Sequence, residues 1–288
     1  MAIIEAYPKT VSSRGTTALA GAVVLQDQEF VKFSELIYRI AGISMAPSKK
    51  PLVSSRLAKR LKHFDLSSYG DYFRFITSPQ GKEELQMTVD MLTTNETHFF
   101  REPKHFDFLR QRIIPERRKG AAFRVWSAAC SSGEEPYSIA MVLDDLLASQ
   151  PWEILASDIS TRIVDKARSG IYPMERMPEI PKPYLNRYCL KGVGEYDGTL
   201  LVEKFLRDRV RFMLHNLTEA PAKLGEFDVI FLRNVMIYFD QETKQKVVAR
   251  LLPLLRPGGY FFVGHSESLN GVTDALKPMA PAIYKKPD

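Results

Sequence analysis

The spacing of apolar residues changes near residue 93, and this change limits the architectures that the chain can adopt. Before this point, apolar residues recur every three or four positions, as in helices that bury one face. After it, short apolar runs alternate with helical stretches, which is typical of strands joined by helices. We therefore predict an α/β protein: a small all-helical domain, then a doubly wound, mostly parallel sheet with helices on both faces.

Helical periodicity begins at Asp27, and Gly42 is expected to stop the first helix. The residues before Asp27 lack this periodicity and are predicted to form a flexible arm. The helices predicted for the first domain cover about residues 27–41, 53–64, 69–76 and 82–93.

Strand-like and helical runs alternate through the second part of the chain. Pro257-Gly258-Gly259 is predicted to form a turn between the last helix and the strand that follows it. The expected strands cover about residues 123–129, 152–157, 210–214, 227–232, 260–264 and 282–286, and the expected helices cover 136–148, 161–169 and 243–255.

A proline-rich stretch interrupts this alternation and is predicted to form an inserted subdomain at residues 171–209. Two strand-like runs, 184–190 and 199–204, flank a glycine-rich turn, which indicates an antiparallel β-hairpin. The chain then divides into an arm, a helical domain, a linker with a connecting helix, and a sheet domain that contains the insertion. The predicted boundaries are 1–26, 27–93, 94–120 and 121–288.

Composition and charge favour a reducing compartment and leave the partner open. Two cysteines in 288 residues cannot supply a disulfide framework, and no apolar run is long enough for a membrane span. The start of the chain does not resemble a secretion signal. We therefore expect a cytoplasmic protein without membrane insertion. The net charge of +6 is compatible with an acidic partner, either protein or nucleic acid.

The loops after the predicted strands are the expected place for chemistry, because ligands bind at the carboxyl ends of parallel strands. The first such loop carries one glycine, Gly133, and two acids, Glu134 and Glu135, which disfavours a phosphate and favours a positively charged group. Asp158 ends the next strand, where an acid can accept hydrogen bonds from ribose hydroxyls. Together they indicate an adenosine-type cofactor. The alternative is an ordinary turn and a helix cap.

Two further polar positions could serve other chemistry. Arg233 follows an apolar strand directly, so its charge must be paired or solvated. His98 lies in a polar segment before the sheet, and no cysteine or second histidine stands near it at ligand spacing, so no metal site is predicted. The sequence also lacks a recognisable Ser-His-Asp pattern or nucleophile elbow.

Five motifs, in this order, resemble the chemotaxis receptor methyltransferase family, CheR. They are Asn95-Glu-Thr-His-Phe-Phe-Arg101, Cys130-Ser-Ser-Gly-Glu-Glu-Pro-Tyr-Ser138, Asp158-Ile, Arg233-Asn-Val-Met-Ile-Tyr-Phe239 and Pro257-Gly-Gly. The resemblance extends from about residue 27 to residue 285, and the combination is specific. The glycine loop alone would indicate only a class I methyltransferase fold.

The resemblance implies a class I methyltransferase-like fold and S-adenosylmethionine as cofactor. The implied reaction is methylation of glutamate side chains on the cytoplasmic helices of transmembrane chemoreceptors. Arg101 and Tyr238 would be catalytic, with Tyr238 facing the methyl-transfer site. We also expect a monomer that binds no nucleic acid. The implied cofactor-binding residues are Asn95, Thr97, Arg101 and Glu135 for the methionine end, Asp158 for the ribose, and Asn216, Leu217, Arg233 and Asn234 for the adenine and sulfonium region.

The chemistry of this reaction agrees with the residues available. Glu135 can meet the ammonium group of the cofactor, and Arg101 can meet its carboxylate. A glutamate acceptor has a reference pKa near 4.3, so it is already ionised at neutral pH and needs no general base. Transfer converts an anion and a cation into two neutral products, which favours a closed, poorly solvated site.

Two features are expected to dock the receptor. A run of six basic residues without an acid, residues 49–62, would fit a glutamate-rich helix, although a solvated helix face is the ordinary alternative. The resemblance implies that the inserted hairpin accepts a receptor's C-terminal peptide as an extra strand in some members. The alternative interpretation of the glycines is a flexible hairpin tip. The residues assigned to docking are Arg56, Lys59, Arg60, Gly192 and Gly194.

Two other classes of function remain open on the sequence. A nucleic-acid methyltransferase is compatible with the basic charge. However, an amino-methylating enzyme would be expected to carry Asn/Asp-Pro-Pro-Tyr/Phe where this chain has Arg233-Asn-Val-Met-Ile-Tyr. A non-catalytic module with the same fold would be suggested by the loss of Asp158 or Arg101, and both residues are present.

Overall fold

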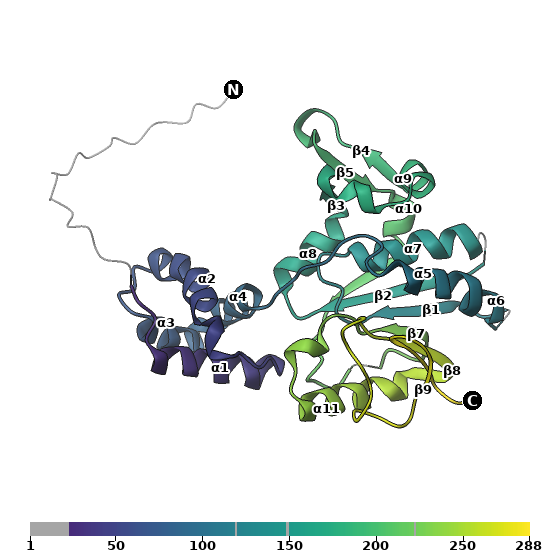
Figure 1. The fold of residues 1–288 in the computed structure, drawn as a ribbon. Helices are drawn as coiled ribbons and strands as arrows, with labels where there is room; N and C mark the ends of the chain where they lie inside the picture. The colour runs from purple at the N-terminus through teal and green to yellow at the C-terminus, as the bar shows by residue number, and fades with distance from the viewer. Residues whose placement is uncertain (1–22, 119, 148–149, 222) are drawn as a thin grey trace.

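The computed structural model describes residues 23–118, 120–147, 150–221 and 223–288. Figure 1 shows the helical domain beside the sheet domain, with a small three-stranded sheet projecting from the larger domain. Most of the predicted N-terminal arm, residues 1–22, lies outside the described residues. Within the described ranges, none of the helices combines the length and the apolar character needed to cross a membrane.

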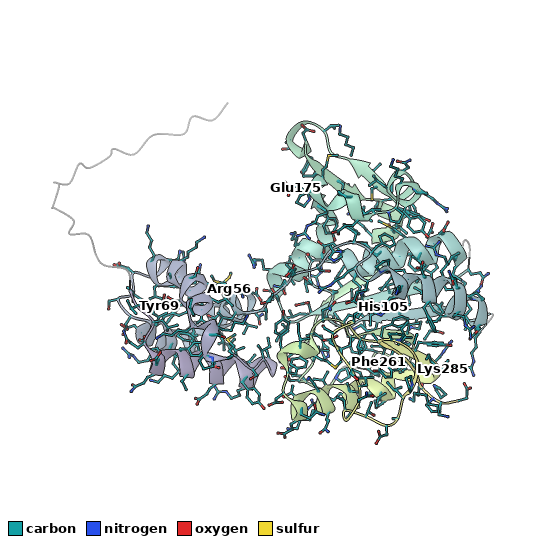
Figure 2. All side chains as sticks on the ribbon, in the orientation of Figure 1. Arg56, Tyr69, His105, Glu175, Phe261 and Lys285 are labelled. Carbon is teal, nitrogen blue, oxygen red and sulfur yellow. The ribbon has the colours of Figure 1, made fainter. Side chains whose placement is uncertain are left out.

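Four helices form the helical domain: α1 (Asp27–Ala41), α2 (Lys50–His63), α3 (Tyr69–Ile76) and α4 (Lys82–Leu92). They confirm the four predicted helices. Gly42 ends α1 with a φ of 70°, a left-handed conformation that glycine adopts without strain. Phe33, Leu57 and Tyr69 are buried in the shared core. Figure 2 shows Tyr69 within this domain and Phe261 within the sheet domain.

A helix with one wide turn connects the two domains. It comprises α5 (Pro103–Phe108), a π-helical turn (Leu109–Ile113) and α6 (Ile114–Glu116). Its apolar side chains, including Phe106 and Leu109, pack into the core of the sheet domain. The connecting helix therefore holds the polar segment that precedes it, residues 94–102, against the sheet.

The large sheet has the strand order β6-β2-β1-β7-β8-β10-β9 among the described residues. The first five strands in this order run parallel, and β10 and β9 are antiparallel additions. Val125 packs with the residues of α7, and Trp126 packs with those of α11, so helices cover both faces. The strands are β1 (Phe123–Ser127), β2 (Trp152–Asp158), β6 (Val210–Leu214), β7 (Phe227–Phe231), β8 (Leu255–Phe262), β9 (Lys277–Ala280) and β10 (Ile283–Lys285), and the main helices are α7 (Glu134–Leu147), α8 (Thr161–Ser169) and α11 (Gln241–Leu251).

The strand order creates a topological switch point between β1 and β7. From β1 the chain moves outward to β2 and β6, and it then returns to β7 on the other side of β1. Loops that leave such neighbouring strands in opposite directions open a crevice at the carboxyl ends. The loops predicted to bind the cofactor all lie at this edge.

One prediction for the C-terminal strands was wrong, and one strand was not predicted. Pro257–Gly259 does not separate the last helix from a strand, because β8 already begins at Leu255 and contains these residues. The pairing of β8 with β7 shifts register between Phe227 and Val229, so Pro257–Gly259 form an irregularity within β8. β9 was not predicted, because Pro278 is a poor strand residue; it is tolerated here at the edge of the sheet.

The insertion forms a second sheet with the order β3-β5-β4. Its elements are β3 (Ile171–Pro173), α9 (Lys182–Tyr188), β4 (Cys189–Lys191), β5 (Thr199–Val202) and α10 (Lys204–Arg207). The antiparallel pair β4 and β5 confirms a hairpin around the glycine-rich turn. The strand predicted over residues 184–188 is wrong. Tyr184 and Tyr188, four residues apart, form a pair of packed rings on one face of α9, with ring centroids 5.5 Å apart.

Candidate active site

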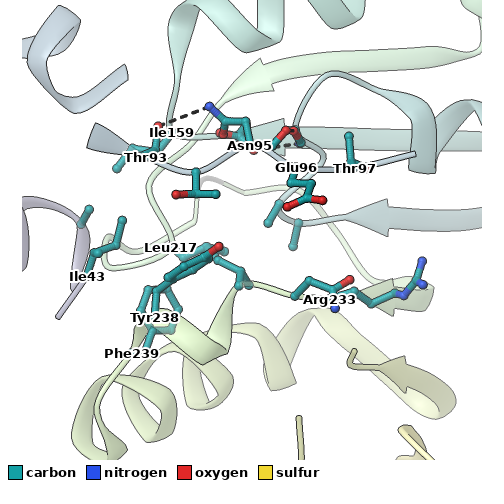
Figure 3. A pocket seen from close by; sticks show the side chains of 18 of the residues that line it. Ile43, Thr93, Asn95, Glu96, Thr97, Ile159, Leu217, Arg233, Tyr238 and Phe239 are labelled. Atoms are coloured by element: carbon teal, nitrogen blue, oxygen red, sulfur yellow. Dashed lines mark hydrogen bonds between the residues drawn. The ribbon is translucent and has the colours of Figure 1, made fainter. Parts of the chain in front are cut away.

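A pocket lies at the carboxyl ends of the parallel strands, and its wall contains every cofactor-binding and catalytic residue predicted from the sequence. Figure 3 shows Asn95 and Thr97 on one side of this pocket and Leu217 and Tyr238 on the other. The predicted residues that line it are Asn95, Thr97, Arg101, Glu135, Asp158, Asn216, Leu217, Arg233, Asn234 and Tyr238.

The helical domain supplies the remaining wall of the pocket. Ile43 forms an isolated antiparallel bridge with Phe239, and Ser44 N donates to Tyr238 O at 2.9 Å. The segment after α1 is therefore joined by backbone contacts to the loop that carries Tyr238. The lining residues from this domain are Ala41, Ile43, Ser44, Met45, Lys49, Leu52, Leu92 and Thr93.

A second contact between the domains lies at the start of α8. The buried carboxylate of Asp90, on α4, accepts from Thr161 N and from Arg162 N, both at 3.1 Å. These N–H groups belong to the first turn of α8, where a negative charge is favoured. Because α8 follows the loop of Asp158, the helical domain also supports the predicted ribose end of the pocket.

Asp158 is buried at the end of β2 and is held by backbone groups. Its Oδ2 accepts from Ser131 N at 2.9 Å, and its Oδ1 accepts from Ser160 N at 3.1 Å. Burial raises the pKa of Asp158, and the N–H groups of Ser160 and Ser131 act against that rise. The two loops around the carboxylate are thus fixed before any ligand arrives.

Arg233 is almost completely buried, and its guanidinium joins two carboxylates. Nη1 donates to Glu135 Oε2 at 2.8 Å, and Nη2 donates to Glu102 Oε2 at 2.9 Å. Glu135 also accepts from Ser127, at the end of β1, at 2.7 Å. The sequence required a partner for Arg233, and the structure provides two. This network fixes the Glu135 carboxylate at the pocket wall.

Glu102 is the member of this network that sequence analysis missed. Burial opposes its ionisation, but Arg233 and the backbone N–H of His265 outweigh burial and lower the pKa of Glu102 to about 2. Glu102 and Phe100, which flank Arg101, have positive φ values of 60° and 53°. Such values are uncommon for residues other than glycine and persist only where surrounding contacts hold them. The position of Glu102 directly after Arg101 was the one sign in the sequence that it could belong to the site.

The polar segment before α5 is tied to the loop after β1. Ser131 Oγ donates to Asn95 O at 2.9 Å, which holds the segment against the loop that follows β1. Arg101 is partly exposed, and its Nη1 donates to Glu96 O at 3.0 Å. The Arg101 cation therefore borders the pocket without an acidic partner among the ion pairs of the described residues.

The insertion also contacts this polar segment. Arg176 Nη1 donates to Thr97 O at 2.6 Å, and the His98 ring lies 3.0 Å from Glu179, measured from Nδ1 to Oε2. Both partners belong to the turn between β3 and α9. Thr97 is buried, and the hydrogen bond from Arg176 of the insertion holds its backbone at the pocket wall.

Asn216 has a role that the sequence did not predict. Its Nδ2 donates to Ile40 O at 2.7 Å, and its Oδ1 accepts from Thr218 N at 3.0 Å. The side chain therefore holds the loop after β6 to the end of α1. Leu217, the next residue, is largely buried and gives this part of the pocket an apolar surface.

The three basic residues assigned to docking have different surroundings. Arg56, labelled in Figure 2, donates from Nη1 to Thr93 O at 3.0 Å at the end of α4. Arg60 pairs with Glu84 through two contacts of 2.7 and 2.6 Å. Lys59 is exposed. Arg56 and Arg60 thus stabilise the helical domain itself, which leaves Lys59 as the accessible cation of the three.

The two glycines assigned to docking shape the hairpin turn. A Cβ atom on Gly192 would lie 2.0 Å from Tyr196 O, and Gly194 has a φ of +61°. Each requirement is met by glycine alone without strain. The turn itself therefore accounts for both residues, and their role in peptide binding stays a prediction.

Two histidines that are distant in the sequence meet beside Glu102. Glu102, His105 and His265 each place one possible metal-ligand atom within 4.8 Å of the others. No metal site was predicted from the sequence, in which 159 residues separate the two histidines. The Glu102 carboxylate is bound to Arg233, and a divalent cation there would lie beside that guanidinium. We therefore assign Glu102 to the anchoring of Arg233.

The donor set of the pocket fits an amino-acid group joined to a nucleoside. Arg101 and Glu135 offer opposite charges at the predicted methionine end, and Asp158 offers two acceptor oxygens. Apolar surface from Leu217 and Phe239 suits an adenine ring. The residues present therefore match S-adenosylmethionine in charge and in polarity.

Comparison with known proteins agrees with this site. Residues 28–93 match the family described as "CheR methyltransferase, all-alpha domain", and residues 95–284 match "CheR methyltransferase, SAM binding domain". The Chemotaxis protein methyltransferase of Escherichia coli (strain K12) is 44% identical over 265 residues, covering 91% of this chain and 92% of that protein. The Chemotaxis protein methyltransferase 2 of Pseudomonas aeruginosa is 43% identical and covers 89% and 92%.

A less similar relative matches over nearly the same length of chain. The Chemotaxis protein methyltransferase of Borreliella burgdorferi is 37% identical over 269 residues, which cover 90% of this chain and 94% of that protein. The two family matches together cover the helical domain, the polar segment and the sheet domain with its insertion. The chain belongs to the CheR methyltransferase family and carries that family's S-adenosylmethionine-binding domain.

Proposed function

We propose that this enzyme transfers a methyl group from S-adenosylmethionine to glutamate side chains of chemoreceptors, on their cytoplasmic helices, and forms methyl esters that serve sensory adaptation. We propose that it does so in the cytoplasm and as a monomer. The observation that carries the proposal is the convergence of all the predicted residues on one pocket at the switch point of the sheet. The names of the relatives support chemotaxis as the process.

Each end of the cofactor has a partner in this pocket. Glu135, held by Ser127 and Arg233, would meet the ammonium group, and Arg101 would meet the carboxylate. Asp158 would accept from the ribose hydroxyls. When bound, S-adenosylmethionine supplies a methyl group on a positively charged sulfur. The residues of the chain align the two reactants and exclude water from between them.

No residue of the enzyme has to remove a proton from the acceptor. A glutamate carboxylate is ionised at neutral pH and attacks as an anion. Tyr238 lines the pocket where the helical domain contacts it and would border the approaching carboxylate. The task of Tyr238 is to orient the acceptor, not to activate it.

The direct test of the proposal is to incubate the protein with methyl-labelled S-adenosylmethionine and receptor-bearing membranes. Label released as methanol by mild base identifies glutamate methyl esters. Base-stable label on protein, or label on added nucleic acid, would contradict the proposal.

The pH dependence of the chemical step tests the absence of a base. The single-turnover rate should stay level from pH 8 down towards the acceptor's own pKa, near 4.3, and then fall as that carboxylate is protonated. The rate is measured by rapid quench over the pH range in which circular dichroism shows a folded enzyme. A fall with a midpoint near 6.5 that His98→Gln removes would show instead that this histidine takes part.

Receptor docking is proposed to use the exposed side of α2. Lys59 and Lys62 are both exposed there, and Lys49, which directly precedes α2, lines the pocket. A cationic surface next to the pocket would attract a glutamate-rich helix and raise the rate of encounter. The docking surface proposed here is therefore Lys59 and Lys62, since Arg56 and Arg60 are engaged within the domain.

Reversing both charges, as Lys59→Glu with Lys62→Glu, should raise the receptor KM about tenfold or more at low salt and leave the cofactor affinity unchanged. Added salt should reduce the difference, because surface charges are screened over about 8–10 Å. The matched control reverses Lys223 and Lys277, two other exposed lysines, and changes the net charge equally. Equal KM values for the two double variants would contradict docking through α2.

The inserted sheet is proposed to bind a receptor's C-terminal peptide. β4 lies at the edge of the order β3-β5-β4, where an added strand can pair with its free backbone groups. Leu190 and Val193 are exposed beside this edge and offer apolar contacts. Gly192 and Gly194 contribute by shaping the turn next to it.

The alternative of a nucleic-acid methyltransferase is not favoured by these findings. Both family matches, and the relatives named above, are chemotaxis methyltransferases. The basic charge that left this alternative open is partly used inside the protein, in the Arg60–Glu84 and Arg233–Glu135 ion pairs.

A further inference from the structure

We propose that Glu267 is a positioning residue for methyl transfer, which sets the loop of Asn234 and Tyr238 through its carboxylate. The inference rests on the proposed function. Glu267 stands in the segment Gly264-His-Ser-Glu267 after β8, which sequence analysis did not single out. It is partly buried, and the pocket wall, as far as the structure describes it, does not include it. Its influence must therefore pass through its neighbours.

The Glu267 carboxylate accepts three backbone N–H groups from two loops. Its Oε2 accepts from Asn234 N at 2.8 Å and from Gly264 N at 2.6 Å, and its Oε1 accepts from Ile237 N at 3.2 Å. The first and third donors belong to the loop after β7, and the second follows β8. One side chain thus joins the carboxyl ends of two neighbouring parallel strands, through charge-assisted hydrogen bonds.

The loop after β7 has little stability of its own. Asn234 has a φ of +56°, which is uncommon for a residue with a side chain. The residues that follow form a single 3-10 turn, Met236–Tyr238, and such turns have poor hydrogen-bond geometry. Without Glu267, two N–H groups of this loop would lose their acceptor. The conformation of the loop therefore depends on the carboxylate.

Gly264 makes this arrangement possible. A Cβ atom at this position would lie 2.5 Å from Asn234 Nδ2 and 2.8 Å from Glu267 Oε2. No side chain fits between the amide and the carboxylate. The Asn234 side chain can therefore lie against the backbone of residue 264, while its Nδ2 reaches Glu102 Oε1 at 3.3 Å.

The loop is held from two sides. Glu267 binds its N–H groups from the sheet domain, and Ser44 N donates to Tyr238 O from the helical domain. Asn234 and Tyr238, which line the pocket, lie between these contacts. Loss of Glu267 would let the loop move, while Asp158, Glu135 and the polar segment keep their positions. The chemical step should therefore suffer more than cofactor binding.

The experiment compares Glu267→Ala, Glu267→Gln and wild type in three measurements. Single-turnover methylation of receptor membranes should fall about 10- to 100-fold in Glu267→Ala. The affinity for S-adenosylhomocysteine, measured by calorimetry, should change much less. Backbone amides of residues 234–238 should exchange faster with deuterium. Glu267→Gln should recover part of the rate, because its amide oxygen still accepts hydrogen bonds.

The control is Asp274→Ala, an exposed acid later in the same segment, which should match wild type in all three measurements. Unchanged exchange at residues 234–238 in Glu267→Ala would overturn the proposal. So would a rate loss no larger than the loss of folded protein seen by circular dichroism. If wild type itself fails to methylate receptors, the proposed function fails, while exchange and calorimetry still decide the role of Glu267.

Discussion

Replacing Arg233 by methionine should destabilise the folded protein by about 3–5 kcal/mol, because it leaves two largely buried carboxylates without their cation. The Arg233 side chain is 2% exposed and lies within 3 Å of both Glu102 and Glu135. Unfolding in urea at pH 7, followed by tryptophan fluorescence, measures the loss. Arg187→Met is the matched control: that arginine is 55% exposed and pairs with Asp144 at 3.3 Å, so its loss should cost less than about 1 kcal/mol.

The pH dependence of this difference identifies its source. The pKa of Glu102 is about 2 in the folded protein, below its ordinary 4.5, so its contribution to stability is fully present above the higher value. This contribution is lost as the pH falls from 4.5 towards 2. The stability difference between wild type and Arg233→Met should therefore shrink over this interval. A difference that stays constant over the interval would mean that packing of the arginine, and not charge pairing, is the source.

Replacing Asp158 by alanine should weaken S-adenosylmethionine and S-adenosylhomocysteine to the same extent, by about 1.5–3 kcal/mol or 10- to 150-fold. The two ligands share the ribose, and the loss should not depend on the methyl group. The same change frees Ser131 N and Ser160 N, so the stability of the variant should fall as well. Calorimetry with each ligand, at a temperature where circular dichroism shows the variant folded, separates the two effects.

Two further variants sharpen this test. Asp158→Asn keeps one acceptor oxygen, so its affinity for both ligands should lie between those of Asp158→Ala and wild type. Asp165→Ala removes an exposed acid from α8, the helix that follows Asp158, and should bind both ligands normally. Wild-type affinity of Asp158→Ala for both ligands would remove this residue from the site.

The parts of the fold that sequence analysis predicted are those in which local signals agree. The stop at Gly42 and the apolar runs of β1, β2 and β7 led directly to the elements observed. Errors arose where local signals were mixed. Tyr184 and Tyr188 are also good strand residues, and their pairing on a helix face became clear only in the structure.

The residues of the site also fall into those that the sequence predicted and those that it did not. The sequence placed Asp158 and Arg233 at this edge of the sheet because each stands at the carboxyl end of an apolar strand, although a helix cap was an alternative for Asp158. Glu102, Glu267 and Asp90 were not predicted, since none of them stands at the end of an apolar strand and an acid elsewhere usually faces solvent. Their partners lie 131, 33 and 71 residues away in the sequence, and no spacing rule covers such distances. Supporting residues of this kind are determined by the topology of the sheet, which brings distant loops together.

The backbone bridge between Ile43 and Phe239, together with the Asp90 contact to α8, has a consequence for how such enzymes can diversify. The helical domain cannot be exchanged between relatives as an independent module. Recombination at the boundary near residue 93 would separate Asp90 from the α8 turn that it holds, and Ile40 from Asn216. Lys59, the proposed docking residue, is exposed and takes no part in these contacts, so it can vary without disturbing the catalytic half.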